Sequence, residues 1–180
     1  MVYMLLGTGF EETEAVAPLD LMRRAKIDVR TVGITGKQVR GSHGITVEAD
    51  LLPGEMDPEK MDMIVLPGGM GGVASARASR EALDALRFAW DNGKFVAAIC
   101  AGPTVLADLG IPEGLHATCY PGCEGQMGGA IMVPDAPVVR DGRLITGASA
   151  GCAVKFGLAL VEALKGAAEA KRIEDQIVIR

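Results

Sequence analysis

The segment FVAAICAGPTVLADLG, Phe95 to Gly110, places a cysteine where an apolar run gives way to a helical pattern. We predict a buried strand over Lys94 to Ile99 and a helix over Ala101 to Leu109, with Cys100 at the junction. A strand-to-helix turn is a position where enzymes hold nucleophiles. Cysteine is also among the most often buried residue types, so position alone leaves a nucleophile and a packing residue both open.

The sequence AAICAG has the layout of a nucleophile elbow, G-x-S-x-G, with Cys100 in place of the serine and Ala98 in place of the first glycine. Ala98, Ala101 and Gly102 supply the small side chains that a tight turn needs. Backbone N–H groups at a helix start favour a thiolate and lower a cysteine pKa from about 8.5 into the range of roughly 3.5 to 7.5. The elbow therefore predicts a thiol that is nucleophilic at neutral pH.

Strand and helix patterns alternate along the rest of the chain. The predicted strands are Val2 to Leu6, Ile27 to Ile34 and Met63 to Leu66, and the predicted helices are Glu11 to Lys26, Ser79 to Asn92 and Ala153 to Leu164. An extended segment turns at Gly41 to Gly44, and VVRDGRLITGAS predicts a hairpin on Asp141-Gly142. This order predicts one α/β domain over residues 1–180, with a mainly parallel sheet and helices on both faces.

Ligands of such sheets bind beyond the carboxyl ends of the strands. Three loops reach that edge, namely GTGFEETE, PGGMGG and CAG. The second glycine of PGG, Gly69, can place a backbone N–H beside that of Ala101 and so form a two-donor oxyanion hole. The alternative for PGGMGG is a flexible loop.

Three carboxylates follow the first predicted strand. Glu11, Glu12 and Glu14 fit a solvated helix start, and for Glu11 and Glu12 this is the interpretation we prefer. A carboxylate that pointed into the crevice would repel a thiolate unless it kept its proton and donated a hydrogen bond to the sulfur. A neutral glutamic acid beside the cysteine is therefore the second possibility.

Composition narrows the classes of function. The chain has 180 residues, 49% hydrophobic and 23% charged, and a net charge of −5, so we do not expect nucleic acid as a partner. No apolar run approaches the roughly 18 residues of a membrane span, and we expect a cytoplasmic protein. Four cysteines are few for a disulfide scaffold. They are Cys100, Cys119, Cys123 and Cys152.

The two histidines, His43 and His116, are candidates for a base or a ligand. His43 is the better candidate for a pocket residue, because its glycine-flanked loop can lean over the crevice. Cys119, Cys123 and His116 lie near one another in sequence, but their spacing matches no common zinc pattern and a fourth ligand is missing. We therefore expect no metal.

Four segments, GFEETEAVAPLDLMRRAKIDV, IVLPGGMGG, AAICAGPTVLADLGI and LALVEAL, resemble the ThiJ/PfpI family, in particular its protein deglycase (parkinsonism-associated) branch, over nearly the whole chain. The resemblance implies a flavodoxin-like three-layer sandwich, usually a homodimer. It makes Cys100 the reactive cysteine and Glu14 a protonated acid that contacts its sulfur. It makes Gly69 and Ala101 the backbone donors.

Family activities implied by the resemblance include conversion of methylglyoxal or glyoxal to hydroxy acids without a cofactor, repair of glycated substrates, and oxidation of the cysteine in stress sensing. Protease-like relatives place a histidine directly after the cysteine, where this chain has Ala101, and some branches have a histidine where this chain has Tyr120. Without an adjacent histidine a peptidase lacks its general base. We therefore expect a glyoxalase or deglycase, with a redox sensor or chaperone and a small-amide cysteine hydrolase as the alternatives.

Overall fold

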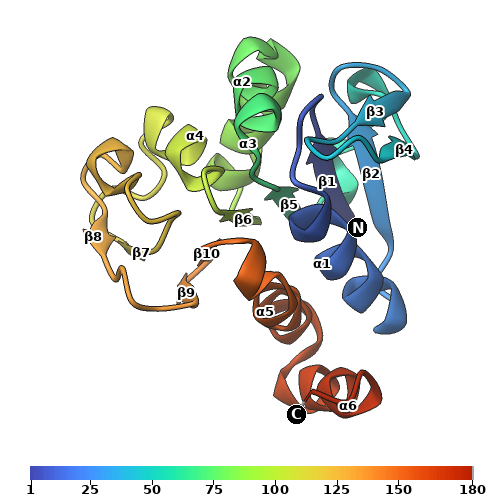
Figure 1. The fold of residues 1–180 in the computed structure, drawn as a ribbon, viewed down its shortest axis with the longest axis vertical. Helices are drawn as coiled ribbons and strands as arrows, with labels where there is room; N and C mark the ends of the chain where they lie inside the picture. Colours follow the sequence, from blue (N-terminus) through green and yellow to red (C-terminus); the bar gives the residue numbers. More distant parts are fainter. Residues whose placement is uncertain (180) are drawn as a thin grey trace.

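The computed structural model describes residues 1–179 and is built around a six-stranded sheet (Figure 1). The strand order is β2-β1-β5-β6-β10-β9, and only β9 runs antiparallel to its neighbour. The strands are β1 (Val2–Leu6), β2 (Val29–Gly33), β5 (Met63–Leu66), β6 (Phe95–Ile99), β9 (Val138–Asp141) and β10 (Leu144–Gly147). Counted among themselves, the five parallel strands have the flavodoxin-like order 2-1-3-4-5.

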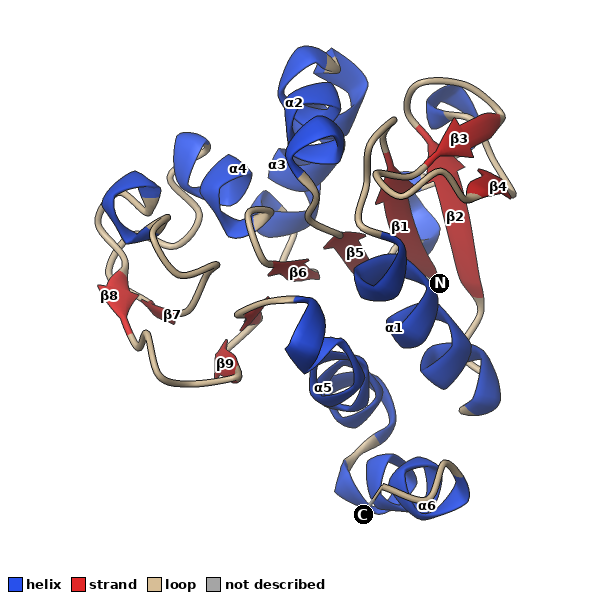
Figure 2. Cartoon of the chain, in the orientation of Figure 1, coloured by secondary structure: helices blue, strands red, loops and turns tan. Residues whose placement is uncertain are grey.

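Helices cover both faces of the sheet and make a three-layer sandwich, as predicted (Figures 1 and 2). One layer holds α1 (Glu12–Arg24), α5 (Ala153–Lys165) and α6 (Ala167–Gln176). The other holds α2 (Met70–Ala78), α3 (Arg80–Asp91) and α4 (Pro103–Asp108). Each layer closes a separate apolar core against the sheet. Burial on both faces explains why the central strands are continuous apolar runs.

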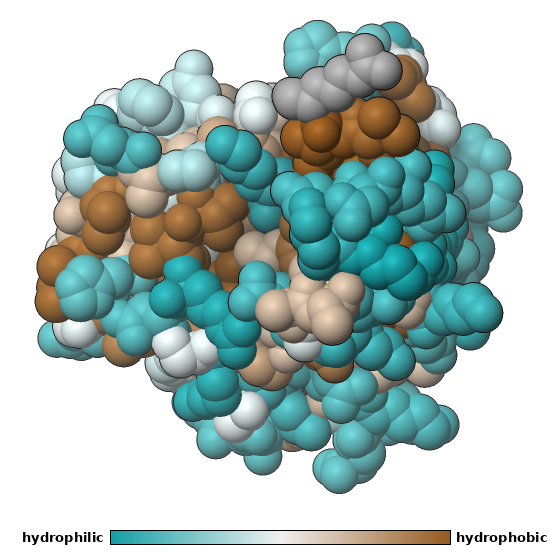
Figure 3. Space-filling model, turned by 90° about the horizontal axis from the view of Figure 1, so that it is seen from below, coloured by the Kyte–Doolittle hydropathy of each residue, from teal (hydrophilic) through white to brown (hydrophobic). Residues whose placement is uncertain are grey.

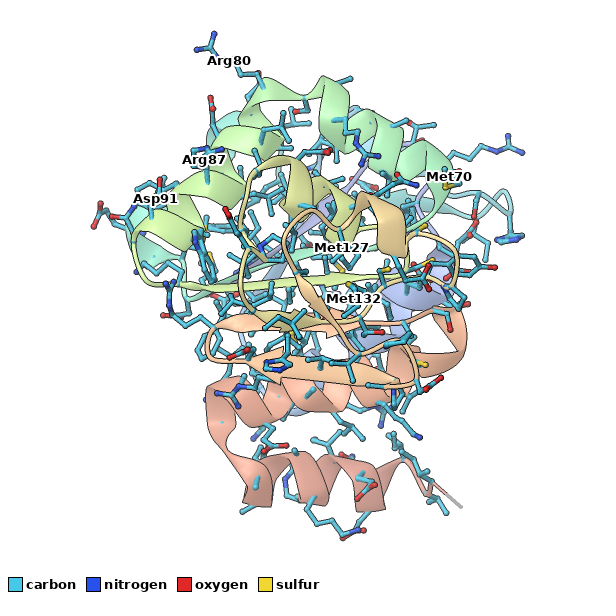
Figure 4. The ribbon with its side chains drawn as sticks, turned by 90° about the vertical axis from the view of Figure 1, so that its left-hand side faces the viewer. Met70, Arg80, Arg87, Asp91, Met127 and Met132 are labelled. Atoms are coloured by element: carbon cyan, nitrogen blue, oxygen red, sulfur yellow. The ribbon has the colours of Figure 1, made fainter. Side chains whose placement is uncertain are left out.

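Helix α3 shows how the sequence pattern becomes packing. Ser79 caps its start by accepting a hydrogen bond from the Ala82 N–H at 3.2 Å, as the sequence predicted. Ala82, Leu86 and Ala89 face the core, while the exposed Arg80 and Asp91 point away from the body of the molecule (Figure 4). Arg87 is exposed too, and its guanidinium donates to the Leu109 carbonyl at 3.3 Å.

Smaller elements flank the main sheet. Two further pairs of strands are β3 (Gln38–Arg40) with β4 (Thr46–Glu48), and β7 (His116–Ala117) with β8 (Ile131–Met132). Single 3-10 turns span Pro53–Glu55, Pro58–Lys60, Glu124–Gln126 and Ala150–Cys152. The predicted turn at Gly41 to Gly44 and the predicted hairpin on Asp141-Gly142 are both present.

Three elements differ from the sequence prediction. PGGMGG is not simply a loop, because α2 begins at Met70 within it. A second C-terminal helix, α6, follows Gly166. Helix α4 begins at Pro103 rather than at Ala101, because the chain turns through the elbow first. No helix within residues 1–179 is long and apolar enough to cross a membrane.

Candidate active site

Cys100 lies at a sharp elbow between β6 and α4, with a backbone φ of +63°. A positive φ is rare for a residue other than glycine and concentrates at functional sites. Two hydrogen bonds fix this conformation: the Cys100 N–H donates to the Gly147 carbonyl at 2.9 Å, and its carbonyl accepts from the Tyr120 N–H at 2.8 Å. At Gly102 a Cβ would lie 2.8 Å from the Leu66 carbonyl oxygen, so the turn requires glycine there.

Glu14 lies in the first turn of α1 and is completely buried. Its Oε2 accepts a hydrogen bond from the Gly68 N–H at 2.9 Å, and its Oε1 has no hydrogen-bond partner among the described residues. A Cβ at Gly68 would lie 2.5 Å from that Oε2 and 2.7 Å from the Cys100 Cβ. The carboxyl group and the cysteine therefore meet across a glycine.

Burial raises the pKa of Glu14 to about 7. The neighbouring Cys100 thiol opposes the rise in the Glu14 pKa, and the charge of Glu11 adds to the rise. The direction agrees with the predicted neutral glutamic acid, because a desolvated carboxyl group holds its proton more tightly.

The backbone N–H groups of Gly69 and Ala101 both interact with the Cys100 sulfur and favour its thiolate. Gly69 has a φ of +84° and is the residue before α2, so its N–H is free of helical hydrogen bonds. The structure thus brings together the two donors that the sequence suggested.

The expected lowering of the Cys100 pKa was wrong. Burial raises the pKa of the thiol to about 12, and the charge and hydrogen bond of Glu14 add to the rise. The two N–H groups oppose it without overcoming it. The helix-start argument overstated the effect of α4, which is short and begins only at Pro103.

Cys100 and Glu14 form a pair in which a half-buried thiol and a buried carboxylic acid compete for protons. Ionising both is costly, because like charges repel in a desolvated site. The pair therefore carries at most one negative charge near neutral pH, and the N–H groups of Gly69 and Ala101 favour the form with that charge on the sulfur and the proton on the carboxyl group. This arrangement provides a nucleophile, a proton carrier and two oxyanion donors.

Glu12 and His43 form a separate cluster beside this site. The prediction that Glu12 belongs to a solvated helix start was wrong. Glu12 is only 6% exposed and accepts hydrogen bonds from the β3–β4 turn. The donors are the His43 N–H at 2.7 Å, the Ser42 hydroxyl at 3.1 Å and the His43 Nδ1 at 3.0 Å. Burial is the largest single influence and raises the pKa of Glu12. The hydrogen bonds together outweigh it and lower the pKa to about 2. His43 itself is exposed and its pKa is raised, first by the hydrogen bond to Glu12.

Glu11, Glu12 and His43 each place one ligand atom within 4.8 Å of the others, which is close enough to hold a metal ion. Internal donors already engage both carboxylates, since Glu11 caps α1 by accepting from the Glu14 N–H at 2.7 Å. We therefore describe this cluster as a hydrogen-bonded clamp on the β3–β4 turn.

The remaining candidates lie around the elbow or outside it. Tyr120 contacts the elbow through its backbone, and its side chain is exposed. His116 on β7 pairs with Asp141 on β9 at 3.0 Å. A cavity of about 620 Å³, lined in part by Lys26, Lys94 and Lys165, lies at the amino edge of the sheet, away from all of these groups.

Residues 1–163 match the model of the DJ-1/PfpI family. The chain belongs to the DJ-1/PfpI family. Protein dj-1beta of Drosophila melanogaster is 35% identical over 178 residues, covering 98% of this chain and 95% of that protein. Its crystal structure superposes with a TM-score of 0.95 at 34% identity, over 99% of this chain and 97% of that one. These values place the chain in the DJ-1 branch of the DJ-1/PfpI family.

Another DJ-1/PfpI relative carries the name of an activity. A protein of Pyrococcus abyssi named as a deglycase is 32% identical over 146 residues, covering 81% of this chain and 87% of that protein. A structure described as oxidised DJ-1 of Toxoplasma gondii has a TM-score of 0.91 at 33% identity, over 98% of this chain and 97% of that one.

Proposed function

We propose that this protein is a cofactor-independent glyoxalase or deglycase that acts on α-oxoaldehydes such as methylglyoxal, or on their adducts with thiols and amines. One observation carries the proposal: the Cys100 thiol lies on the elbow with the unpartnered, buried carboxyl oxygen of Glu14 on one side and two backbone donors on the other. The name of the Pyrococcus relative supports the same class of reaction.

The proposed reaction begins when the Cys100 sulfur adds to the aldehyde carbon and forms a hemithioacetal. The Gly69 and Ala101 N–H groups stabilise the oxyanion of this addition, and Glu14 supplies its proton. Glu14 then takes the proton of the former aldehyde carbon while the neighbouring carbonyl oxygen gains a proton, which gives an enediol. Return of a proton from Glu14 to the neighbouring carbon, with loss of the proton from the hydroxyl of the former aldehyde carbon, converts the enediol to a hydroxyacyl thioester. Water hydrolyses the thioester, releases the hydroxy acid and returns the thiol.

A hydrolase of small amides is a weaker candidate, because the mechanism would need a base for its nucleophile. Both histidines are engaged elsewhere, His43 with Glu12 and His116 with Asp141. A redox sensor that uses the same cysteine is the second candidate, and the oxidised Toxoplasma relative gives it specific support.

The setting that we propose is a homodimer in the cytoplasm. A reducing compartment keeps Cys100 as a thiol, which the reaction requires. The face of the molecule in Figure 3 carries apolar patches among hydrophilic side chains, and Val16 and Val154 are exposed on α1 and α5. Apolar surface of this kind is consistent with a partner subunit.

The test is lactate formation from methylglyoxal by purified protein without glutathione. We expect turnover by the wild type, loss of turnover in Cys100→Ser with an unchanged circular dichroism spectrum, and retention in the control Cys152→Ser. A glycated thiol adduct and a peptide amide are tested in parallel. Lack of turnover on both the aldehyde and the adduct would contradict the proposal, and cleavage of the amide alone would favour the hydrolase.

A further inference from the structure

Two cysteines that the proposed reaction does not use lie on the loop between β7 and the Glu124–Gln126 turn. Cys119 is 3% exposed and Cys123 is half-buried. Both belong to one apolar cluster together with Met127, which is labelled in Figure 4. The loop therefore holds a buried and a more accessible thiol in the same environment.

The two cysteines converge on a single atom, the carbonyl oxygen of Tyr120. The Cys119 sulfur donates to this oxygen at 3.5 Å, and the Cys123 N–H donates to it at 2.9 Å. Pro121 and Gly122, the latter with a φ of +96°, fold the chain back between them as a type II turn does. A disulfide needs its two Cα atoms within about 7 Å. This turn folds Cys123 back onto Tyr120, the residue that follows Cys119.

We propose that Cys119 and Cys123 form a reversible intrachain disulfide when a hydroperoxide reaches the protein, and that thiols reverse it. The more accessible Cys123 attacks the peroxide oxygen, becomes a sulfenic acid and releases water or an alcohol. The Cys119 sulfur then attacks the Cys123 sulfur and forms the S–S bond. The sulfenic hydroxyl leaves with the Cys119 proton as water, and the two thiols have passed two electrons to the peroxide.

The order of the two steps follows from the environments of the two thiols. Burial raises the pKa of Cys119 to about 12, and the negative charges of Glu124 and Cys123 add to the rise. Cys119 therefore stays protonated and protected in the reduced protein, while Cys123 is the thiol that an oxidant meets.

The disulfide would act on the candidate active site through Tyr120. This residue lies between the two cysteines, and its N–H donates to the carbonyl oxygen of Cys100 at 2.8 Å. Closing the S–S bond would restrain the segment that holds the elbow in its left-handed conformation. The pair is thus placed to report oxidation to the site without consuming Cys100.

The test maps the disulfide by mass and needs no enzyme assay, so it stands apart from the proposed function. Native protein is treated with limiting hydrogen peroxide, free thiols are alkylated, and the chain is cut after glutamate. Cleavage after Glu113 and Glu124 places Cys119 and Cys123 in one peptide and Cys100 in another. We expect the first peptide to be unalkylated and lighter by two hydrogen atoms, and to accept two alkyl groups after reduction.

Two variants serve as controls. Cys100→Ser should keep the cross-linked peptide, and Cys123→Ser should lose it while its circular dichroism spectrum stays unchanged. Full alkylation of Cys119 and Cys123 in the oxidised wild type, or a cross-link from either of them to Cys100, would overturn the proposal.

Discussion

At the scale of single residues, Gly68 decides how close the two acids of the site can lie. Its N–H holds the Glu14 carboxyl group at 2.9 Å, and its missing side chain leaves room for the Cys100 Cβ. The Ile99 carbonyl oxygen lies 2.9 Å from the position that a Cβ would take. Backbone and carboxylate crowd that position together, so no side-chain rotation relieves the clash.

Gly68→Ala should therefore abolish turnover of methylglyoxal and lower the free energy of unfolding by roughly 1 to 3 kcal/mol, the usual cost of overpacking. Gly54→Ala is the matched control, because nothing lies within 4 Å of its Cβ position. Urea denaturation and lactate assays measure both effects. Equal stability and equal turnover of the two variants would show that the missing side chain at Gly68 does not matter for the site.

A second prediction separates the two roles of Glu14. In Glu14→Gln the amide keeps a hydrogen-bond donor for the sulfur but carries no charge and cannot transfer a proton. The pKa of Cys100 should fall below that of the wild type, because the charge of Glu14 contributes to its rise. Turnover should nevertheless be lost. Thiolate absorbance followed across pH measures the pKa of Cys100, and the lactate assay measures turnover. An active Glu14→Gln variant would show that Glu14 does not transfer a proton in the reaction.

At the scale of secondary structure, Glu12 ties the start of α1 to the β3–β4 turn. Its two carboxylate oxygens accept from Ser42 and from the backbone and ring of His43. A Cβ at Gly41 would lie 2.4 Å from this carboxyl group, so the turn closes tightly on it. The clamp fixes a loop directly beside the helix turn that carries Glu14.

Glu12→Leu should loosen this turn and lower the free energy of unfolding by about 0.5 to 1.5 kcal/mol, the usual net contribution of a hydrogen bond, since it removes the acceptor of the Ser42 and His43 donors. Hydrogen exchange at the His43 and Ile45 amides should accelerate, while exchange in β6 should change little. Glu48→Leu, an exposed position on the same hairpin, is the control. Similar exchange in both variants would contradict the clamp.

The same elements show what the sequence could and could not predict. The alternation of strands and helices, the elbow and the Ser79 cap follow from local patterns that the tertiary structure reinforces. Helix α2 was not predicted because its sequence contains glycines, which disfavour helices. The structure needs glycine there for close packing, since a Cβ at Gly72 would lie 2.8 Å from the Phe10 Cα. The burial of Glu12 was missed because its donors come from a turn about 30 residues away in sequence, and spacing along one helix does not report such a contact.

At the scale of the whole molecule, the sheet buries a carboxyl group that water would otherwise keep ionised. The folded protein holds the Glu14 proton up to about pH 7, whereas a free glutamate releases it near its ordinary pKa of 4.5. Between these values the folded state binds more protons than the unfolded state. The contribution of Glu14 to stability is therefore present at low pH and is lost as pH rises toward 7.

Glu14→Gln should consequently be more stable than the wild type in alkaline solution and similar to it in acid. The difference between 4.5 and about 7 corresponds to about 3 kcal/mol, which sets the upper limit of the gain. Urea denaturation of both proteins at about pH 5 and about pH 8 measures it. His43 is common to both proteins, so its own titration cancels in the comparison, and Glu12 loses its contribution only below both pH values. A gain that is equal at the two pH values would show that Glu14 does not hold a proton in the folded protein, and the proposed proton transfer would then lack its carrier.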